Sequence, residues 1–424
     1  MAKTITGKQV GDSYYQVEHP SGLTVLLYPK EHCSTTYAIF GTRYGSIDNC
    51  FQRSDEAGPE SVPEGIAHYL EHKLFESEEG DAFERFSKTG ASANAFTSFE
   101  STCYLFSTTD QVYQSLEILL DFVQSPYFTE ETVRKEQGII GQEIKMYDDD
   151  PQWRVMFNYL KAMYHSHPIR EDIAGTVESI AKITPELLYR CYNTFYNLGN
   201  MVLAIAGNFQ VDKALAVCDK MLKPAAPVTV QRVFPQEPDT IVQPVVEERL
   251  SVASPLFQFG FKEPGADQPR SEKDVAATEV LLETLASDAS PLFRRLLDQG
   301  LVNESSFSYE YFEGNGYATV MFSGESKDPQ AVAQAILEEV ERFQREGIPA
   351  EAFERSKRAL YGELVAALNS TGSIANGLVN MHLKGRELFT YIDSLASLRL
   401  EDGEERLRQV FQRERSVLSV ILPH

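Results

Sequence analysis

The sequence predicts an α+β fold made of two tandem domains that share one plan, each a mixed or antiparallel sheet flanked by helices. Short apolar runs rich in branched and aromatic residues alternate with longer segments whose apolar residues recur every three to four positions. This order of elements occurs twice along the chain. A proline-rich stretch without helical period at residues 225–240 separates the two series and is predicted to be a linker.

The first domain is predicted to span residues 1–224. Its expected elements are, in chain order, strands at 24–28 and 36–40, a helix around 66–75, strands between 93 and 106, a helix over 128–147, a strand at 201–206 and a helix over 213–222. The helix over 128–147 has Thr129 as a plausible N-cap and Glu130 and Glu131 in its first turn, where negative charge is favourable.

The second domain is predicted to span residues 241–424. Its expected elements are strands at 256–261, 317–322 and 417–422, with helices at 272–285 and near 292–297 and further helices before the last strand. The chain of 424 residues is long enough for two sizeable cores. Two copies of about 200 residues therefore fit the pattern better than one large fold.

Composition predicts a soluble cytoplasmic enzyme. The five cysteines are scattered, odd in number and without C-x-x-C spacing, which is typical of reduced thiols. The N-terminus lacks an apolar signal region, and no run approaches the length of a membrane helix. The formal charge of −23 argues against nucleic acid or an anionic membrane as a partner. It would suit basic peptides, although a solvated acidic surface is the commoner explanation.

Residues 68–72 read His-x-x-Glu-His, the most informative motif of the chain. On a helix, residues three and four apart share a face, so His68, Glu71 and His72 point into one small volume. Two neutral imidazoles suit Zn²⁺, and an unligated carboxylate beside them can take a proton from water on the metal. Apolar residues surround the motif nearly all round, so this helix is expected to be buried. The alternative is a core helix whose histidines only form hydrogen bonds.

A catalytic zinc site needs a third protein ligand, and the predicted helix over 128–147 offers two candidates. Glu136 and Glu143 are seven residues apart, so they share a face two turns apart. Ile139 and Ile140 lie on the same side, which suggests that this face looks into the core. Either glutamate could complete the site, and the spacing alone does not choose between them.

Several dispersed motifs together resemble the pitrilysin/insulysin family, the inverzincin zinc metallopeptidases. The matching segments, in the family's order, are 68–75, 90–98 with its N-A-F-T core, 136–144, 167–168, 175–176, 183–184 and 200–208. The resemblance is close over the first half of the chain, where these segments lie, and weaker over the second half. The resemblance implies one Zn²⁺ per chain held by His68, His72 and Glu143. It also implies Glu71 as the general base and Glu136 as a carboxylate that orients the site.

The strand expected around 93–97 has its own physical interpretation. It is predicted to be one arm of a β-meander with the apolar run at 103–106. An exposed edge strand can bind an extended peptide through main-chain hydrogen bonds. The resemblance implies that this edge holds the substrate beside the zinc, which makes Ala93, Asn94, Ala95 and Phe96 candidate substrate-binding residues. Without the resemblance, an ordinary sheet edge would be the simpler interpretation. His165 and His167 are predicted to be structural.

The second repeat has no His-x-x-Glu-His and is predicted to be non-catalytic. Full-length members of the resembling family, with four repeats, place an arginine and, seven residues on, a tyrosine near the zinc from a later repeat. No arginine after residue 240 has a tyrosine seven positions later here. The chain therefore resembles the metal-bearing half of a clamshell, as in the zinc-bearing subunit of mitochondrial processing peptidase and of short two-domain bacterial members. A related chain without zinc is the expected partner in a heterodimer, and a homodimer is the alternative.

The sequence thus predicts a zinc metalloendopeptidase that cleaves unfolded peptides or a precursor peptide with metal-activated water, with low activity alone. One alternative is a zinc-binding but inactive structural or assembly subunit of a larger complex, which the intact motif disfavours. A non-peptidase metallohydrolase is the other alternative, and the predicted peptide-binding strand argues against it.

Overall fold

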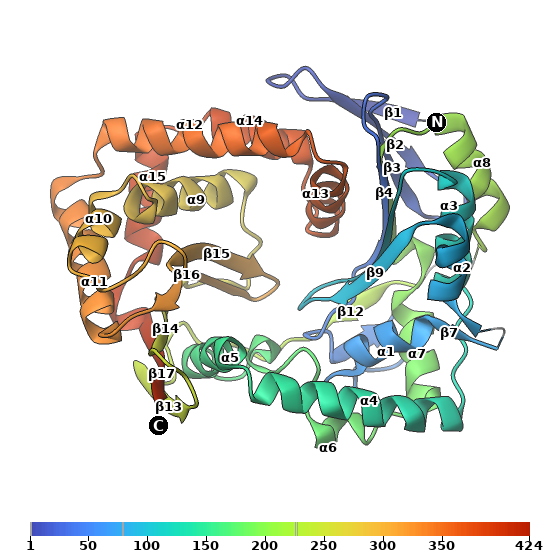
Figure 1. Cartoon of the computed structure of the whole chain (residues 1–424), viewed down its shortest axis with the longest axis horizontal. Helices are drawn as coiled ribbons and strands as arrows, with labels where there is room; N and C mark the ends of the chain where they lie inside the picture. Colours follow the sequence, from blue (N-terminus) through green and yellow to red (C-terminus); the bar gives the residue numbers. More distant parts are fainter. Residues whose placement is uncertain (1, 79, 225, 227) are drawn as a thin grey trace. The chain divides into compact units, whose positions relative to one another are not determined.

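The structure is a computed structural model that describes residues 2–78, 80–224, 226 and 228–424. Helices flank mixed and antiparallel sheets, which confirms the predicted fold class (Figure 1). The chain forms two compact units. The first unit comprises Met1–Ile144, Glu171–Val233 and Val365–Thr390, and the second unit comprises Lys145–Arg170, Phe234–Leu364 and Tyr391–His424.

A seven-stranded mixed sheet forms the centre of the first unit, with strand order β1-β2-β3-β11-β4-β10-β9. Its strands are β1 (Ala2–Thr6), β2 (Ser13–Glu18), β3 (Thr24–Pro29), β4 (Thr36–Thr42), β9 (Ser92–Thr97), β10 (Thr102–Thr108) and β11 (Met201–Gly207). Strand β11 runs parallel to β3 and antiparallel to β4. Because β11 is central and buried along its whole length, its sequence is a continuous apolar run.

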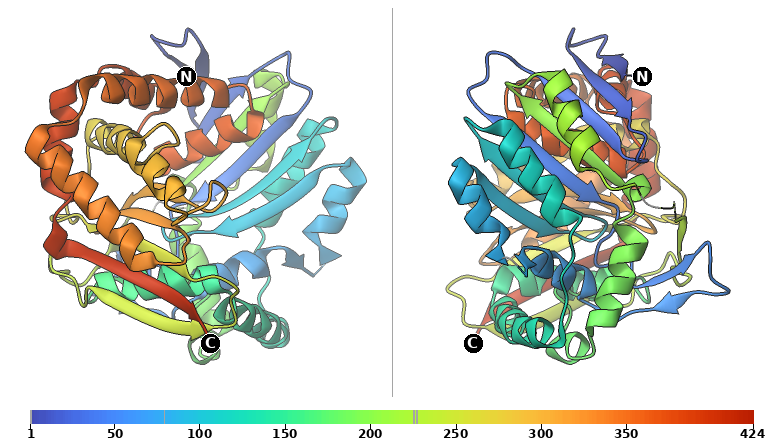
Figure 2. Two further views of the ribbon diagram at one scale, coloured as in Figure 1. Left: turned by 60° about the vertical axis from the view of Figure 1, so that its left-hand side comes forward. Right: turned by 90° about the vertical axis from the view of Figure 1, so that its right-hand side faces the viewer.

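Helices cover both faces of this sheet (Figure 1). The helices of the first unit are α1 (Ile66–Leu74), α2 (Ala82–Thr89), α3 (Val112–Val123), α4 (Glu130–Asp148, up to residue 144), α6 (Val177–Ile180), α7 (Pro185–Phe195), α8 (Val211–Met221) and α13 (Thr371–Leu383). Figure 1 shows the sheet between α3 and α13, and in the right-hand view of Figure 2 the teal α3 and yellow-green α8 lie in front of the strands.

Helix α13 reaches the first unit from late in the sequence and packs on β4 and β11. The contact is close at Gly41 of β4, where a Cβ would lie 3.0 Å from a methyl carbon of Val379. Ile374, Leu378 and Val379 of α13 are at most 2% exposed. The core of the first unit therefore includes a helix that lies more than 160 residues after β11, the last strand of its seven-stranded sheet.

The second unit contains a five-stranded sheet with order β13-β17-β14-β16-β15. Its strands are β13 (Val245–Leu250), β14 (Leu256–Lys262), β15 (Ser308–Gly314), β16 (Tyr317–Glu325) and β17 (Ser416–Pro423). The left-hand view of Figure 2 shows the yellow β13 and the red β17 side by side and parallel. Helix α5 (Pro151–Met163), from the first half of the sequence, packs on β14 and β17.

The other helices of the second unit come from the C-terminal half of the chain. They are α9 (Glu272–Ala286), α10 (Pro291–Asp298), α11 (Pro329–Glu346), α12 (Ala350–Ala367), α14 (Leu388–Ala396) and α15 (Leu400–Val410), of which α12 and α14 cross the unit boundaries at 364/365 and 390/391. Short strands β5 (Cys50–Arg53), β6 (Glu60–Ser61) and β12 (Val230–Arg232) make a separate small sheet in the first unit, and β7 (Glu76–Ser77) pairs with β8 (Gly80–Asp81).

The expected elements appear within a few residues of their predicted bounds. The helix predicted over 128–147 is α4 (Glu130–Asp148), and the Thr129 hydroxyl accepts a hydrogen bond from the Thr132 amide at 3.2 Å, as an N-cap does. The predicted strand pair between 93 and 106 is β9 with β10. Local apolar runs and periods were sufficient for these assignments because each element buries at least one face.

The predicted division at 1–224 and 241–424 stays a prediction, since the compact units exchange segments of sequence. The predicted linker at 225–240 contains β12, which pairs with β5, and Arg232 Nε lies 2.6 Å from the buried Asp48 Oδ1. Further along, Glu237 Oε1 accepts from Lys262 Nζ at 2.6 Å. Ala225 and Pro227 of the predicted linker lie outside the described residues.

We predict that residues 1–224 expressed alone will show no cooperative unfolding transition. Without α13, which carries the buried Ile374, Leu378 and Val379, the faces of β4 and β11 that this helix contacts would be exposed to water. Losing the burial of three large apolar side chains lowers the free energy of unfolding by about 5–9 kcal/mol, which is similar to the whole stability of a domain. Urea denaturation followed by circular dichroism checks this, with co-expression of residues 225–424 as the restoring control. A cooperative transition in the isolated piece would contradict it.

Candidate metal centre

Helix α1 is fixed at its start by two glycines. Gly65 precedes the helix with φ 85°, and a Cβ there would lie 2.3 Å from the Ala174 carbonyl oxygen. Gly175 has φ +73°, and a Cβ on it would lie 2.6 Å from the Glu64 carbonyl oxygen. Only glycine fits two backbones that approach this closely in the left-handed region. The helix is buried along its length except at His72, as its apolar surroundings predicted.

His68, His72 and Glu143 converge in the first unit. His68 Nε2 lies 3.7 Å from Glu143 Oε1, and His72 Nε2 lies 3.4 Å from Glu143 Oε2. The atoms of the three side chains that could bind a metal lie within 4.8 Å of one another. Two elements supply them, since the histidines are on α1 and the glutamate is on α4, which lies beside α1 in Figure 1. The structure thus selects Glu143, rather than Glu136, as the group facing both histidines.

This arrangement fits a zinc ion. The two histidine–glutamate separations, 3.7 and 3.4 Å, exceed ordinary N–H···O hydrogen bonds and are close to the spacing of donor atoms around a tetrahedral ion, about 3.3–3.5 Å for bonds near 2.0–2.2 Å. Burial, with the neighbouring His72 as the next cause, lowers the pKa of His68 to about 4. The imidazole is therefore neutral near pH 7, as a metal ligand must be. Two histidines and one glutamate are a donor set of catalytic zinc sites, which keep a further position open.

Glu136 orients His72 from the other side of the ring, with His72 Nδ1 3.1 Å from Glu136 Oε1. Burial alone would lower the pKa of His72, but this hydrogen bond and the nearby carboxylates outweigh it and raise the pKa. Burial would likewise raise the pKa of Glu136, yet the bond to His72 leaves it lowered. With Nδ1 donating to Glu136, Nε2 faces Glu143, an arrangement common around metal-binding histidines. His68 differs, because its buried Nδ1 has no hydrogen-bond partner among the described residues.

Glu71 lies beside this group and is 9% exposed. Its Oε2 accepts a hydrogen bond from the Thr97 hydroxyl at 3.2 Å. Burial raises the pKa of the Glu71 carboxyl to about 7, against the opposing effects of His72 and Thr97. A carboxyl with a pKa near neutrality can both take and return a proton at physiological pH.

Strand β9 is the last strand of the seven-stranded sheet and contacts α1. It pairs with β10 on one side. Asn94 is exposed and accepts from the Ala95 amide through its Oδ1 at 2.9 Å, while Ala93, Ala95 and Phe96 are half-buried. The four predicted substrate-binding residues therefore lie on an edge strand next to the helix that carries the two histidines.

The histidines predicted to be structural belong to the second unit. His167 Nε2 lies 2.9 Å from the Asn315 carbonyl oxygen, and its Nδ1 accepts from the Ile169 amide at 3.1 Å. Burial lowers the pKa of His167 to about 4. With both ring nitrogens bonded to backbone groups, the neutral ring holds two loops together. The His165 amide donates to Glu237 Oε1 at 2.9 Å.

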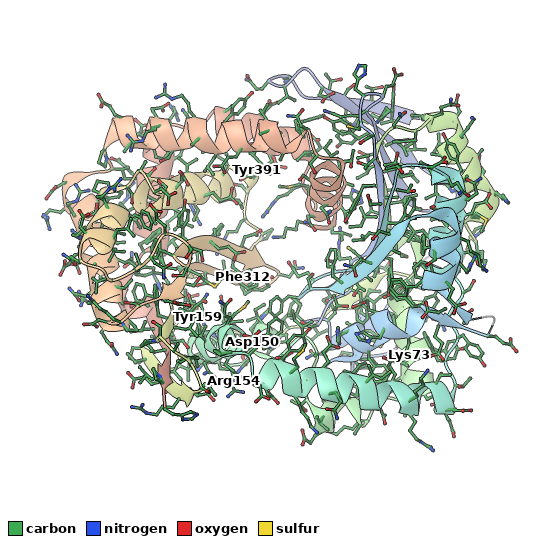
Figure 3. The ribbon with its side chains drawn as sticks, viewed as in Figure 1. Lys73, Asp150, Arg154, Tyr159, Phe312 and Tyr391 are labelled. Carbon is green, nitrogen blue, oxygen red and sulfur yellow. The ribbon has the colours of Figure 1, made fainter. Side chains whose placement is uncertain are left out.

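Two residues near the site were missed in the sequence. Thr97 immediately follows the four candidate residues in the matched 90–98 segment, and that position was the available signal. Lys73, labelled on α1 in Figure 3, is fully buried and pairs with Glu76. Its positive charge is one of the causes that lower the pKa of Glu136. A lysine is rarely fully buried, so its burial on α1 could not be expected from the residue type.

Family models match two parts of the chain. The model described as Insulinase (Peptidase family M16) matches residues 60–177, which include the whole His/Glu cluster. The model described as Peptidase M16 inactive domain matches residues 182–360. The chain is also 39% identical over 428 residues to the uncharacterized zinc protease YmfH of Bacillus subtilis, covering 100% of both chains.

The chain belongs to peptidase family M16. A putative M16-like peptidase from Alicyclobacillus acidocaldarius has the same fold with a TM-score of 0.92 and 36% identity, over 100% of this chain and 98% of that chain. The probable mitochondrial-processing peptidase subunit beta of Arabidopsis thaliana is 24% identical over 344 residues, covering 77% of this chain and 63% of the relative. The predicted resemblance to the insulysin family is therefore confirmed.

Pitrilysin matches with a TM-score of 0.73 and 16% identity, over 99% of this chain but 46% of pitrilysin. At that identity the match shows the fold alone, and it confirms that this chain corresponds to half of a pitrilysin-type protein. The relatives named zinc proteases support a peptidase of the hydrolase class. Within the described residues, none of the helices has the length and apolarity needed to cross a membrane.

We predict that metal-free Glu71→Gln protein is more stable than metal-free wild type at pH 8. The folded pKa of about 7 lies above the usual 4.5, so folded Glu71 holds its proton more tightly than unfolded Glu71. As the pH rises from 4.5 to 7, ionisation of Glu71 therefore lowers the free energy of unfolding of the wild type by up to about 3 kcal/mol. The variant has no carboxyl at this position and does not lose this stability.

Urea unfolding in a chelator at pH 4.5 and pH 8 measures the difference. The exposed Glu31→Gln, in the turn after β3, is the control and should match wild type at both values. A Glu71→Gln protein no more stable than wild type at pH 8 would contradict the assigned shift.

Proposed function

We propose that this chain is the catalytic subunit of a two-chain zinc metalloendopeptidase that cleaves unfolded peptides or a precursor peptide. The convergence of His68, His72 and Glu143 beside a buried Glu71 carries this proposal. These three residues would hold one Zn²⁺ per chain, and the relatives' names as zinc proteases support that metal.

A zinc ion bound there would acidify a water molecule and polarise the scissile carbonyl. Glu71 accepts the proton of the attacking water and returns it to the leaving amine, for which a buried carboxyl is suited. Glu136 holds the ring of His72 in place through Nδ1. The acid–base work and the orientation of the histidines thus fall to different carboxylates.

Strand β9 would bind the substrate as an added strand through the backbone of Ala93, Asn94, Ala95 and Phe96. Its position at the end of the sheet supports this role. Main-chain pairing demands an extended peptide but little particular sequence. The proposed substrates are therefore unfolded segments, either loose peptides or a precursor's extension.

The second chain would be a related subunit without zinc, and a second copy of this chain is the alternative. Two observations support a missing half: the chain matches 46% of pitrilysin, and a relative is named as one subunit of a processing peptidase. The absence of an arginine–tyrosine pair seven residues apart after residue 240 agrees with this. We place the enzyme in the cytoplasm, where its five free thiols would stay reduced.

An inactive, zinc-binding assembly subunit is the second candidate. The match of residues 182–360 to a domain described as inactive agrees with it, and agrees equally with a non-catalytic second repeat beside a catalytic first one. The catalytic subunit and the inactive assembly subunit would both bind zinc, but only the first would cleave peptides. Measuring zinc content and peptide cleavage on the same sample therefore separates them.

We predict that Glu71→Gln retains about one zinc per chain and loses at least 100-fold in peptide cleavage. The ligands survive this change, whereas the proton acceptor does not. The assay uses tagged chain isolated from its own cells with the chains that co-purify, and a fluorogenic library of unstructured peptides. Glu131→Gln, outside the site, is the control.

The same assay on the chain purified alone should give about 1% or less of the activity of the assembled form. Cleavage by Glu71→Gln at the wild-type rate would refute the role of Glu71. Vigorous cleavage by the isolated chain would refute the need for a partner. Zinc-loaded wild-type assemblies without any cleavage would favour the assembly subunit.

A further inference from the structure

The last residue of strand β9 contacts the buried carboxylate of the site. Thr97 Oγ1 lies 3.2 Å from Glu71 Oε2, and Thr97 is paired with Thr102 across the β9–β10 ladder. The preceding residues 93–96 form the edge to which a peptide would add. Among the described residues, β9 is thus the last strand of its sheet and its final residue donates a hydrogen bond directly to Glu71.

Neighbouring groups fix the direction of this hydrogen bond. The buried Thr102 hydroxyl donates to the Tyr44 carbonyl oxygen at 2.9 Å and lies 3.5 Å from Thr97 Oγ1. An ionised carboxylate carries no proton and only accepts, so Thr97 is the donor in its contact with Glu71. In the longer contact between the two threonines Thr102 is the donor, which leaves the Thr97 proton for Glu71.

A glutamate carboxylate needs such a partner to have one orientation. The last torsion of a glutamate side chain is broad, so packing alone fixes it poorly. Thr97, in contrast, is β-branched, has a restricted χ1, and belongs to a strand that is hydrogen-bonded to its neighbour. Its hydroxyl is therefore a well-placed anchor for Glu71.

We propose that Thr97 is a positioning residue that fixes the orientation of the Glu71 carboxylate relative to strand β9. This inference rests on the proposed function and deepens it. The strand that receives the peptide would also set the direction in which the base points. The peptide and the hydroxyl that orients the base would then belong to one strand, although the base itself is a residue of α1. Small errors in such geometry are costly in rate.

The test compares Thr97→Val, which removes the hydroxyl at nearly constant shape, with Thr97→Ser, which keeps it. Thr24→Val is the matched control, since Thr24 of β3 donates to Glu18 Oε2 at 2.9 Å in the same sheet, outside the site. We expect Thr97→Val to lower kcat about 10- to 100-fold in the co-purified assembly, with KM and zinc content within about twofold of wild type. Thr97→Ser should recover kcat to within about threefold, and Thr24→Val should leave it unchanged.

A second readout does not depend on turnover. Crystal structures of zinc-loaded wild type and Thr97→Val show the orientation of the Glu71 carboxylate in each protein. We expect one orientation, hydrogen-bonded to Thr97, in the wild type. In the variant we expect the carboxylate to be displaced or to occupy several orientations. If Thr97→Val does not fold, Thr97→Ala serves in its place. If wild type with zinc cleaves no peptide, the proposed function fails, and the crystal structures still decide the role of Thr97.

Three results would overturn the inference. The first is a Thr97→Val protein with kcat within twofold of wild type or with an unmoved Glu71. The second is a failure of Thr97→Ser to recover kcat, which would make the effect one of shape rather than of the hydrogen bond. The third is an equal loss in Thr24→Val, which would make it a general weakening of the sheet.

Discussion

Burial of the polar face of α1 is the constraint on which the rest of the site depends. His68 and Glu71 are each at most 9% exposed, and taking such groups out of water is unfavourable unless they find partners. The fold supplies partners from separate elements: Glu143 and Glu136 from α4, and Thr97 from β9. A cation between the two histidines and Glu143 would complete this compensation. The same burial that costs stability gives Glu71 a proton affinity suited to catalysis.

The surrounding architecture holds these elements at fixed separations. The close approach of Gly65 and Gly175 fixes the start of α1, and the β9–β10 ladder fixes Thr97. Helix α13 seals the face of β4 and β11, although it arrives from the far end of the sequence. The candidate site therefore depends on residues throughout the chain, even though the groups that would do chemistry lie between residues 68 and 143.

Much of the site could be predicted because its signals are local. The five-residue motif puts three groups on one helical face wherever the helix lies, and the apolar period located α4 and the β9–β10 pair. Spacing could not separate Glu136 from Glu143, since both share a face. The structure separates them by the ring atom each meets: Glu136 faces Nδ1 of His72, and Glu143 faces Nε2.

What the sequence did not reveal depends on tertiary contacts. Helix α5, from the first half of the sequence, belongs to the second unit, and α13, from the second half, belongs to the first unit. An amphipathic period predicts that a helix buries one face, but not which sheet that face covers. Thr97 and Lys73 are ordinary in sequence, and their importance arises only from what they touch. The chain passes between the two compact units at several points within helices and loops of ordinary composition. Nothing in the sequence marks those points, unlike the proline-rich stretch.

The most direct test of the account is the metal content of the purified chain, measured by elemental mass spectrometry beside a His68→Ala variant. His19→Ala, at a histidine that pairs with Ser21 and Asp219 outside the cluster, controls for general loss of a histidine. The account predicts about one zinc per chain in wild type and in His19→Ala, and almost none in His68→Ala. Wild-type chain without zinc after dialysis against the metal, or equal zinc in the His68→Ala variant, would contradict it.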